Sequence, residues 1–293
     1  MTKTGNKSYS WLVGGLIFAI FWASASTATK IGLTVAQPLV IAVTRFAMAA
    51  IIMLFVSHFI QNNRLPRGKE WLQISIYGIL NISIYLGLYV VAMQKVTAGI
   101  GSLAVAINPV FISFFSVIFL NKKLTYSLFL ALAICTLGVV CAAWPLFKNA
   151  SVTTEGLIIL FVSMLSYALA AIYFSAKRWG NLSLLTINGW QTCIGGLLLL
   201  PFVIFFYNDE LNHFDLTFWS SVTWLAIPVS IVAVQLWLWL LKTNAVKAGL
   251  WLFLCPLFGF IIAAVLAKEA ISLYTFIGVI LVLGGLFIAK KTN

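Results

Sequence analysis

The chain has 293 residues, of which 62% are hydrophobic and 8% are charged. A soluble domain carries about 25% charged residues, so this composition excludes one and indicates an integral membrane protein. The net charge of +12 could suggest nucleic-acid binding, but the basic residues gather at the ends of apolar runs, which argues against that class.

Ten apolar runs follow one another along the chain, separated by short connections. Most have close to the ~20 residues that a helix needs to cross ~30 Å of hydrocarbon. A helix satisfies its own backbone hydrogen bonds where water is absent, so each run is predicted to be helical. The runs are residues 11–30, 38–60, 71–93, 98–120, 126–146, 156–176, 184–206, 218–241, 245–267 and 273–289.

The charges between the runs predict the orientation of the chain. If the N-terminus is cytoplasmic, thirteen of the eighteen basic residues fall on the inner side and four on the outer side, while Arg45 lies inside a run. Five of the six acidic residues fall outside. The positive-inside rule then places both termini in the cytoplasm, in a multi-pass protein of the cell (inner) membrane.

An internal repeat is visible at a spacing of 147 residues, which pairs Pro109 with Pro256. Two halves are therefore predicted, residues 1–147 and 148–293, with five helices each. Because five is odd, the second half must enter the membrane from the opposite side, and inverted repeats are typical of secondary transporters. The same spacing pairs Lys95 with Lys242, Leu103 with Leu250, Phe111 with Phe258, Phe129 with Phe276 and Gly138 with Gly285.

With these features the chain resembles the drug/metabolite transporter superfamily, in its ten-helix EamA-type branch. The resemblance rests on the paired five-helix halves, the small-residue helices that lead to Asn108-Pro109 and Cys255-Pro256, and the closing segment from Glu269 to Ser272, followed by Gly278 and Gly284-Gly285. It implies export of amino acids and other small metabolites across the inner membrane. One departure is that residues 121–125 lack the Glu that the family often places before the equivalent Leu-Thr.

A polar stripe on the third run marks a candidate solute path. Tyr77, Asn81, Tyr85 and Tyr89 recur every four residues and so share one helix face. Polar residues inside a span face protein or water, so Asn81, Tyr85 and Tyr89 are candidate binding residues. The alternative is that they join helices, with Tyr77 as an interfacial anchor.

Arg45 is a full charge placed roughly 10 Å below the outer surface. Its planar guanidinium can bind a carboxylate or phosphate of the solute. The alternative is a structural arginine that caps carbonyl groups or extends toward the interface. Its counterpart in the second half, 146 residues further along in a weaker match, is the neutral Gln191.

Pro109 and Pro256 lie near the middle of the fourth and ninth runs and are predicted to kink them as hinges. The freed carbonyls and the Asn108 amide could contact the solute, although plain kinking and close packing are the alternative. The further cavity candidates are Trp22, Ser26, Tyr167, Gln235, Trp239 and Trp251.

These observations predict an all-α membrane protein with ten transmembrane helices as two inverted five-helix repeats. Its expected function is alternating-access transport of small metabolites, with amino acids and related amphiphilic solutes favoured and export expected; the alternative is an exporter of multiple drugs or amphipathic compounds. No residue cluster indicates an enzyme, a metal site or a cofactor. The partners expected are the solute and the bilayer, not nucleic acid, in a monomer or homodimer. Because no acidic residue lies deep in a span, facilitated diffusion or exchange is expected.

Overall fold

The computed structural model describes residues 3–123, 125–149, 153–267 and 273–290, and these are helical with no β-strand among them. Seven helices are long and apolar enough to cross a membrane, and three shorter apolar helices lie at residues 126–141, 245–259 and 276–289. The prediction of ten membrane-crossing passages in an all-α fold is confirmed.

The first repeat crosses in five passages, several of which combine consecutive helices. Its elements are α1 (Lys3–Gly32), α2 (Pro38–Phe55) with η1 (Val56–Ile60), α3 (Lys69–Gly78) with η2 (Ile79–Leu86) and α4 (Gly87–Lys95), α5 (Ala98–Val105) with α6 (Asn108–Leu120), and α7 (Tyr126–Asn149).

The second repeat follows the same order. Its elements are α8 (Thr154–Ala176), α9 (Leu184–Leu197) with α10 (Leu200–Phe206), α11 (Leu216–Trp224) with η4 (Leu225–Ala233) and α12 (Val234–Thr243), α13 (Ala245–Leu250) with η5 (Trp251–Phe253) and α14 (Leu254–Ala267), and α15 (Leu273–Lys290). A short 3-10 turn, η3 (Asp209–Leu211), lies between α10 and α11.

Several passages begin at a side-chain cap, which satisfies a backbone N–H that the helix leaves unpaired. Asp215, for example, accepts a hydrogen bond from the backbone N–H of Phe218 at 2.9 Å. The residues that cap in this way are Thr97, Thr153, Ser183, Asp215 and Asn244. The polar residues between the apolar runs therefore define where the helices start.

The two repeats share the same irregularities. A π-helix occupies residues 79–86 in one and residues 225–233 in the other, and these positions coincide at the 147-residue spacing. The α5–α6 passage is interrupted at residues 106–107, directly before Asn108-Pro109, and its counterpart contains the 3-10 turn η5 at residues 251–253. π-Helical segments are rare and often lie at functional sites.

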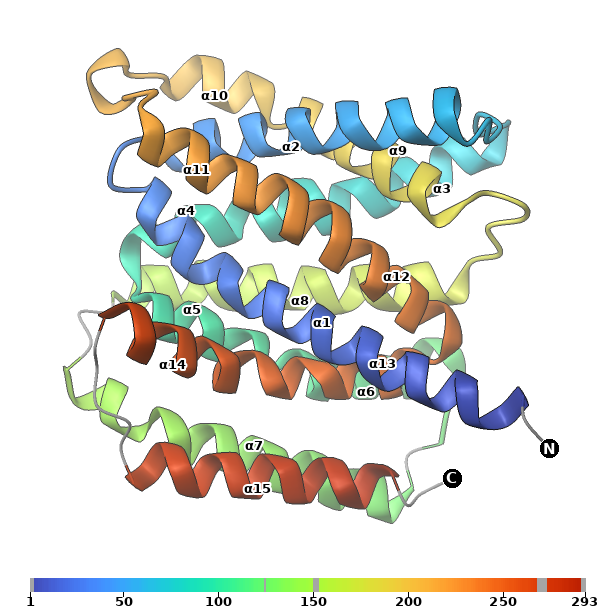
Figure 1. Cartoon of the computed structure of the whole chain (residues 1–293), viewed down its shortest axis with the longest axis vertical. Coiled ribbons are helices and arrows are strands. Elements are labelled where there is room, and N and C mark those ends of the chain that lie inside the picture. Colours follow the sequence, from blue (N-terminus) through green and yellow to red (C-terminus); the bar gives the residue numbers. More distant parts are fainter. Residues whose placement is uncertain (1–2, 124, 150–152, 268–272, 291–293) are drawn as a thin grey trace.

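The first helix of each repeat packs against the other repeat. Helix α1 packs against α14, α11, η4 and α12, whereas α8 packs against α6, α4 and η2. In Figure 1, α1 runs between α14 and the α11–α12 passage. The two packed groups of helices are therefore not the two halves of the sequence, because each half contributes its first helix to the other group.

Helices α7 and α15 pack chiefly against each other and run in opposite directions (Figure 1). A Cβ atom on Gly138 would lie 2.8 Å from the Gly278 carbonyl oxygen, and one on Gly285 would lie 2.9 Å from the Ala131 carbonyl oxygen. These two contacts are equivalent at the 147-residue spacing. Antiparallel equivalent helices with equivalent contacts are what an inverted repeat requires, so this prediction is also confirmed.

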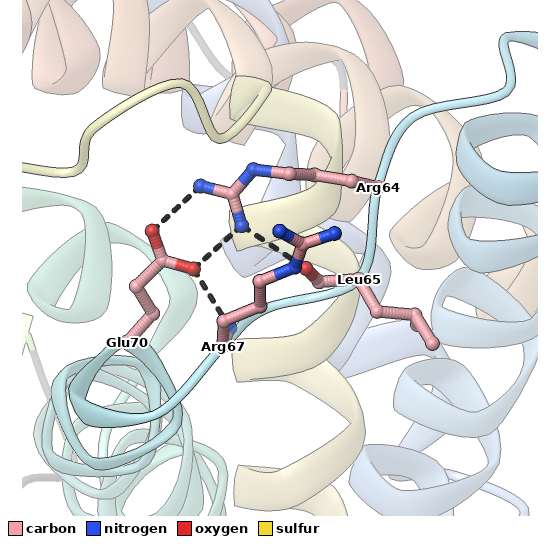
Figure 2. A network of polar contacts seen from close by, with 4 residues as sticks. All are labelled: Arg64, Leu65, Arg67 and Glu70. Atoms are coloured by element: carbon pink, nitrogen blue, oxygen red, sulfur yellow. Dashed lines mark hydrogen bonds and ion pairs between the residues drawn. The ribbon is translucent and has the colours of Figure 1, made fainter.

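Polar contacts tie the connections together at each end of the helices. At the end where α1 begins, Glu70 accepts hydrogen bonds from both terminal nitrogens of Arg64, at 2.7 and 2.6 Å, and from the Arg67 backbone N–H at 2.8 Å (Figure 2). At the opposite end, the Gln37 side chain accepts from the Asn208 backbone N–H and from the Asn212 amide, each at 2.8 Å. The second group of contacts joins the two repeats.

Candidate functional site

A chain of buried polar side chains joins four passages. The Asn81 amide donates to Gln191 Oε1 at 3.1 Å, and Gln191 Nε2 donates to Asn188 Oδ1 at 3.0 Å. Asn188 Nδ2 donates to the Ser230 carbonyl oxygen at 3.0 Å. Arg45 Nε donates to Ser230 Oγ at 2.9 Å. We call these five residues the polar network.

Close backbone packing brings the polar network together. Asn81 lies on η2, Gln191 and Asn188 lie one turn apart on α9, and Ser230 lies on η4. A Cβ atom on Gly78 would lie 2.7 Å from the Gln191 carbonyl oxygen, so only glycine allows α3 to approach α9 this closely. The π-helices η2 and η4 thus each carry a member of the polar network, and each is hydrogen-bonded to a side chain of α9.

Arg45 has an unmatched positive charge within the described part of the protein. It is 6% exposed, and its Nη2 atom has no hydrogen-bond partner there. The two ion pairs found among the described residues are Arg64–Glu70 and Lys95–Glu155, so neither involves Arg45. Removing a cation from water without a counter-ion costs several kcal/mol, and the Phe46 ring, 5.2 Å from the guanidinium, offsets only part of that cost. The position therefore favours an anion.

Aromatic rings from four passages pack beside the polar network. The Tyr167 ring lies 4.6 Å from the Tyr85 ring, 5.8 Å from Trp22 and 5.5 Å from Trp237. Trp237 in turn stacks on Phe18 at 5.0 Å. We call these five residues the aromatic cluster. They come from α1, η2, α8 and α12, and each is at most 6% exposed. Both repeats contribute to the cluster.

Two tyrosines connect the polar network to the aromatic cluster. Tyr85 and Tyr89 both lie near Arg45, Tyr85 follows Asn81 by four residues on η2, and the two tyrosine rings are 6.1 Å apart. Tyr85 also packs directly on Tyr167. The polar network and the aromatic cluster are therefore neighbours that meet along η2.

Seven of the predicted site residues, Arg45 among them, therefore belong to the polar network or the aromatic cluster or lie between the two. The polar network contains Asn81 and Gln191, the aromatic cluster contains Trp22, Tyr85 and Tyr167, and Tyr89 lies between the two groups. Tyr77 lies apart from them, because it packs against Phe174 and Trp179 at 5.4 and 6.1 Å.

Several other predicted residues lie elsewhere. Trp251 packs on Trp11 at 5.2 Å and on Gly15, and a Cβ atom on Gly14 would lie 2.8 Å from Trp239, so both tryptophans contact the first turns of α1 in the membrane. Ser26, in contrast, lies one turn after Trp22 on α1, and its hydroxyl donates to the Ala23 carbonyl oxygen of its own helix at 3.2 Å.

Gln235 and Asn108 each keep an oxygen atom without a partner in the described part of the chain. Gln235 is half-buried on α12. Asn108 is fully buried and its Nδ2 atom lies 3.1 Å from the Met164 sulfur, one turn from Tyr167 on α8. Asn108 therefore borders the aromatic cluster without belonging to it.

The two prolines lie at equivalent close contacts between the repeats. A Cβ atom on Gly249 would lie 3.5 Å from Pro109 Cα. On the equivalent side, the Ser102 hydroxyl donates to the Cys255 carbonyl oxygen, next to Pro256, at 3.3 Å. Pro109 and Pro256 thus lie where the α5–α6 and α13–α14 passages meet.

Sequence reasoning missed Asn188, Ser230 and Trp237. Asn188 precedes Gln191 by one helical turn, so the two side chains share a helix face and Asn188 could have been predicted from Gln191. Ser230 follows Pro228 within an otherwise apolar run, and serines are common in spans, which leaves little signal. Trp237 lies two residues from both Gln235 and Trp239, so a prediction that those two share the inward face of the helix does not include it.

Among the described residues, no group of three or more His, Cys, Asp or Glu side chains is placed to hold a metal ion. The chemistry of the site therefore depends on the guanidinium, amide and hydroxyl groups of the polar network and on the ring faces of the aromatic cluster. Such groups can bind and release a polar solute.

Known proteins resemble this chain over nearly its full length. An uncharacterized transporter of Archaeoglobus fulgidus is 28% identical over 96% of this chain and 98% of its own. Protein PecM of Dickeya dadantii is 25% identical over 93% and 89%, and the uncharacterized transporter YoaV of Bacillus subtilis is 25% identical over 96% and 97%.

A solved crystal structure has the same fold, with a TM-score of 0.78 over 97% of both chains at 16% identity. The sequence profile of the EamA-like transporter family matches the chain twice, at residues 9–144 and at residues 154–290. The chain therefore belongs to the EamA-like transporter family.

Proposed function

We propose that this protein is a secondary transporter that moves small amphiphilic metabolites, above all amino acids, across the cell membrane by alternating access. The observation that carries the proposal is the buried Arg45, which lacks a counter-charge in the described structure and lies beside an aromatic cluster built by both repeats. A small solute with an anionic group and an apolar part complements both features.

The exchange of α1 and α8 between the repeats supports alternating access. Each packed group of helices contains parts of both repeats, so a rocking motion between the groups would expose the site to one side and then the other. The interrupted passages around Pro109 and Pro256, together with the paired π-helices, supply places where the backbone can change shape.

The orientation follows from the charges. We propose that the ends of the helices near Lys3 and Lys290 face the cytoplasm, because thirteen of the eighteen basic residues lie on that side. In this orientation the contacts of Gln37 with Asn208 and Asn212 close the outer end. The expected direction of transport is export, and the expected state is a monomer or homodimer.

A second candidate is an exporter of amphipathic compounds, which the aromatic cluster also suits. Against it, the five acidic residues that the structure describes lie in loops or in the first turns of helices, away from the cluster. They are Glu70, Glu155, Asp209, Glu210 and Asp215. Organic cations would therefore meet ring faces but no carboxylate there.

The test uses purified protein in liposomes loaded with one unlabelled solute at a time, from a panel of amino acids, related metabolites and amphipathic dyes. Counterflow of the labelled solute is measured, and the pH gradient and voltage are varied independently. We expect counterflow of at least one amino acid, which Arg45→Ala and Asn81→Ala reduce. Leu72→Ala, at a side chain that is 64% exposed on the helix surface, is the matched control.

Liposomes that accumulate no panel solute above protein-free controls would contradict the proposal. Normal transport by both site variants would contradict the assignment of the site alone. The orientation is tested separately with cysteines at the exposed Glu210 and Gln61 in a background without the native cysteines. Labelling of Glu210→Cys from the cytoplasmic side would overturn it.

A further inference from the structure

The candidate site has two parts of opposite chemical character. The polar network ends at the guanidinium of Arg45, which can only donate hydrogen bonds and carries a permanent positive charge. The aromatic cluster offers the negative ring faces of two tryptophans and two tyrosines. These parts would attract the two opposite charges of a single solute.

The anionic end is fixed by the orientation of Arg45. Its Nε atom is held by Ser230 Oγ at 2.9 Å, while Nη2 lacks a partner in the described residues. Asn188 in turn holds the Ser230 carbonyl oxygen, so the polar network sets the direction of the guanidinium. Ser230 and Asn188 act through Arg45 and are therefore positioning residues.

The cationic end follows from the packing around Tyr167. Rings of Trp22, Tyr85 and Trp237 surround it with centroid separations of 4.6 to 5.8 Å. No acidic residue that the structure describes belongs to this group or to the helices' interior turns beside it. An ammonium group entering here would be bound by ring faces, the arrangement that stabilises ammonium ligands without a carboxylate.

Tyr85 connects the two ends. It packs on Tyr167 at 4.6 Å, and it lies on the same π-helix as Asn81 of the polar network, four residues further along. Tyr85 therefore borders both ends, so a solute bound beside it would present its anionic group to one end and its cationic group to the other.

We propose that Arg45 Nη2 binds the carboxylate of a zwitterionic solute and that the aromatic cluster around Tyr167 binds its ammonium group. This inference rests on the proposed function, which it makes specific to zwitterions. The rings pack on one another in this structure, so the solute enters between them when the two groups of helices separate. Arg45 and the ring faces then distinguish a zwitterion from a simple acid or a simple amine.

The experiment measures direct binding of matched ligands to the purified full-length protein by equilibrium dialysis. One series is phenylalanine, 3-phenylpropanoate and 2-phenylethylamine, and a second is leucine, 4-methylpentanoate and 3-methylbutylamine. Within a series, the second ligand lacks the ammonium group and the third lacks the carboxylate. We expect wild-type protein to bind the zwitterion of at least one series at least tenfold more tightly than either analogue.

The variants at the two ends should weaken the binding of different ligands. Arg45→Gln should weaken binding of the zwitterion and of the acid about tenfold or more, and it should leave binding of the amine unchanged. Trp237→Leu should weaken binding of the zwitterion and of the amine by about five- to thirtyfold and leave binding of the acid unchanged. Trp237→Phe keeps a ring at this position, so it should retain most of the binding. Ser230→Ala should produce a weaker version of the Arg45→Gln pattern.

If Arg45→Gln and Ser230→Ala weakened the binding of all three ligands equally, the inference would be overturned and Arg45 would be a structural residue. The inference also fails if the protein binds none of these ligands but transports another panel solute, since the proposed function would then stand without it. If Arg45→Gln does not fold, the Ser230→Ala and Trp237 patterns decide the outcome. If no solute is transported at all, the proposed function itself fails.

Discussion

The α7–α15 crossing and the centre of the bundle are both built from equivalent parts of the two repeats, but the crossing is symmetric and the polar side chains at the centre are not. Gly138 packs on Gly278, and Gly285 packs on Ala131, at the same spacing in each repeat. At the centre, Arg45 of one repeat corresponds to the neutral Gln191 of the other, and both belong to one polar network.

The difference separates two tasks. A symmetric scaffold gives two related conformations of similar energy, which alternating access requires. An asymmetric centre can carry a single charge and a single set of ring faces, so it can bind an asymmetric solute. Changes at the crossing should therefore affect stability equally in both repeats, whereas changes at the centre should affect solute binding.

The largest expected effect is on transport by Arg45→Gln. We expect transport to fall at least tenfold, while the melting temperature of the ligand-free protein stays equal to or above that of the wild type. The reason is that the substitution removes a buried charge that lacks a counter-ion in the described structure. Thermal unfolding in detergent and counterflow in liposomes measure the two quantities. A structural arginine would instead give a clear loss of melting temperature.

A large effect on stability is expected at the crossing. Gly138→Leu and Gly285→Leu should each destabilise the protein by about 1–3 kcal/mol or more, because a Cβ atom at either position would overlap backbone atoms of the facing helix. Gly284→Leu is the matched control, since nothing lies within 4 Å of a Cβ atom there. A melting temperature that falls for only one of the two variants would contradict the equivalence of the two contacts.

A moderate effect is expected where the π-helical passage meets α9. Gly78→Ala should lower the melting temperature, because its Cβ atom would lie 2.7 Å from the Gln191 carbonyl oxygen. Gly87→Ala meets only the flexible end of Leu199, at 3.0 Å, and gains the helix propensity of alanine. We therefore expect Gly87→Ala to be neutral or slightly stabilising, and the same loss from both variants would contradict this contact.

The smallest expected effect is that of a pH gradient on transport. No acidic residue lies deep in a described span, so the site has no carboxylate to exchange a proton with the solute. We expect the initial rate of counterflow to change less than twofold when a gradient is imposed. Stoichiometric proton movement coupled to solute would contradict this; Glu269, the remaining acidic residue, lies outside the described residues.

Much of the architecture could be predicted from the sequence because lipid imposes simple rules. Apolar length gave the ten passages, and the 147-residue spacing with an odd number of passages gave inversion. Arg45 and Asn81 were identifiable because polar groups inside a span must face protein or solute. In each case the physical constraint acts on the residue itself or on its own helix.

The remaining features depend on contacts between distant segments. The exchange of α1 and α8 is set by tertiary packing, and it places Trp251 against the start of α1 rather than at the site. The stripe spans two kinds of helix: Tyr77 lies on α3, whereas Asn81 and Tyr85 lie on the π-helix η2, and Tyr77 packs on Phe174. The π-helix η4 contains Pro228, but η2 has no sequence signature that distinguishes it from an ordinary apolar helix.

The most direct test of the account is to lock one end of the protein and measure binding and transport together. Gln37 and Asn212 are hydrogen-bonded across the two repeats, so cysteines at both positions can be joined by a short bis-methanethiosulfonate, which forms reducible disulfides, in a background without the native cysteines. We predict that cross-linking abolishes counterflow, that solute binding persists in the locked protein, and that reduction restores transport. Undiminished counterflow by fully cross-linked protein would contradict alternating access to this central site.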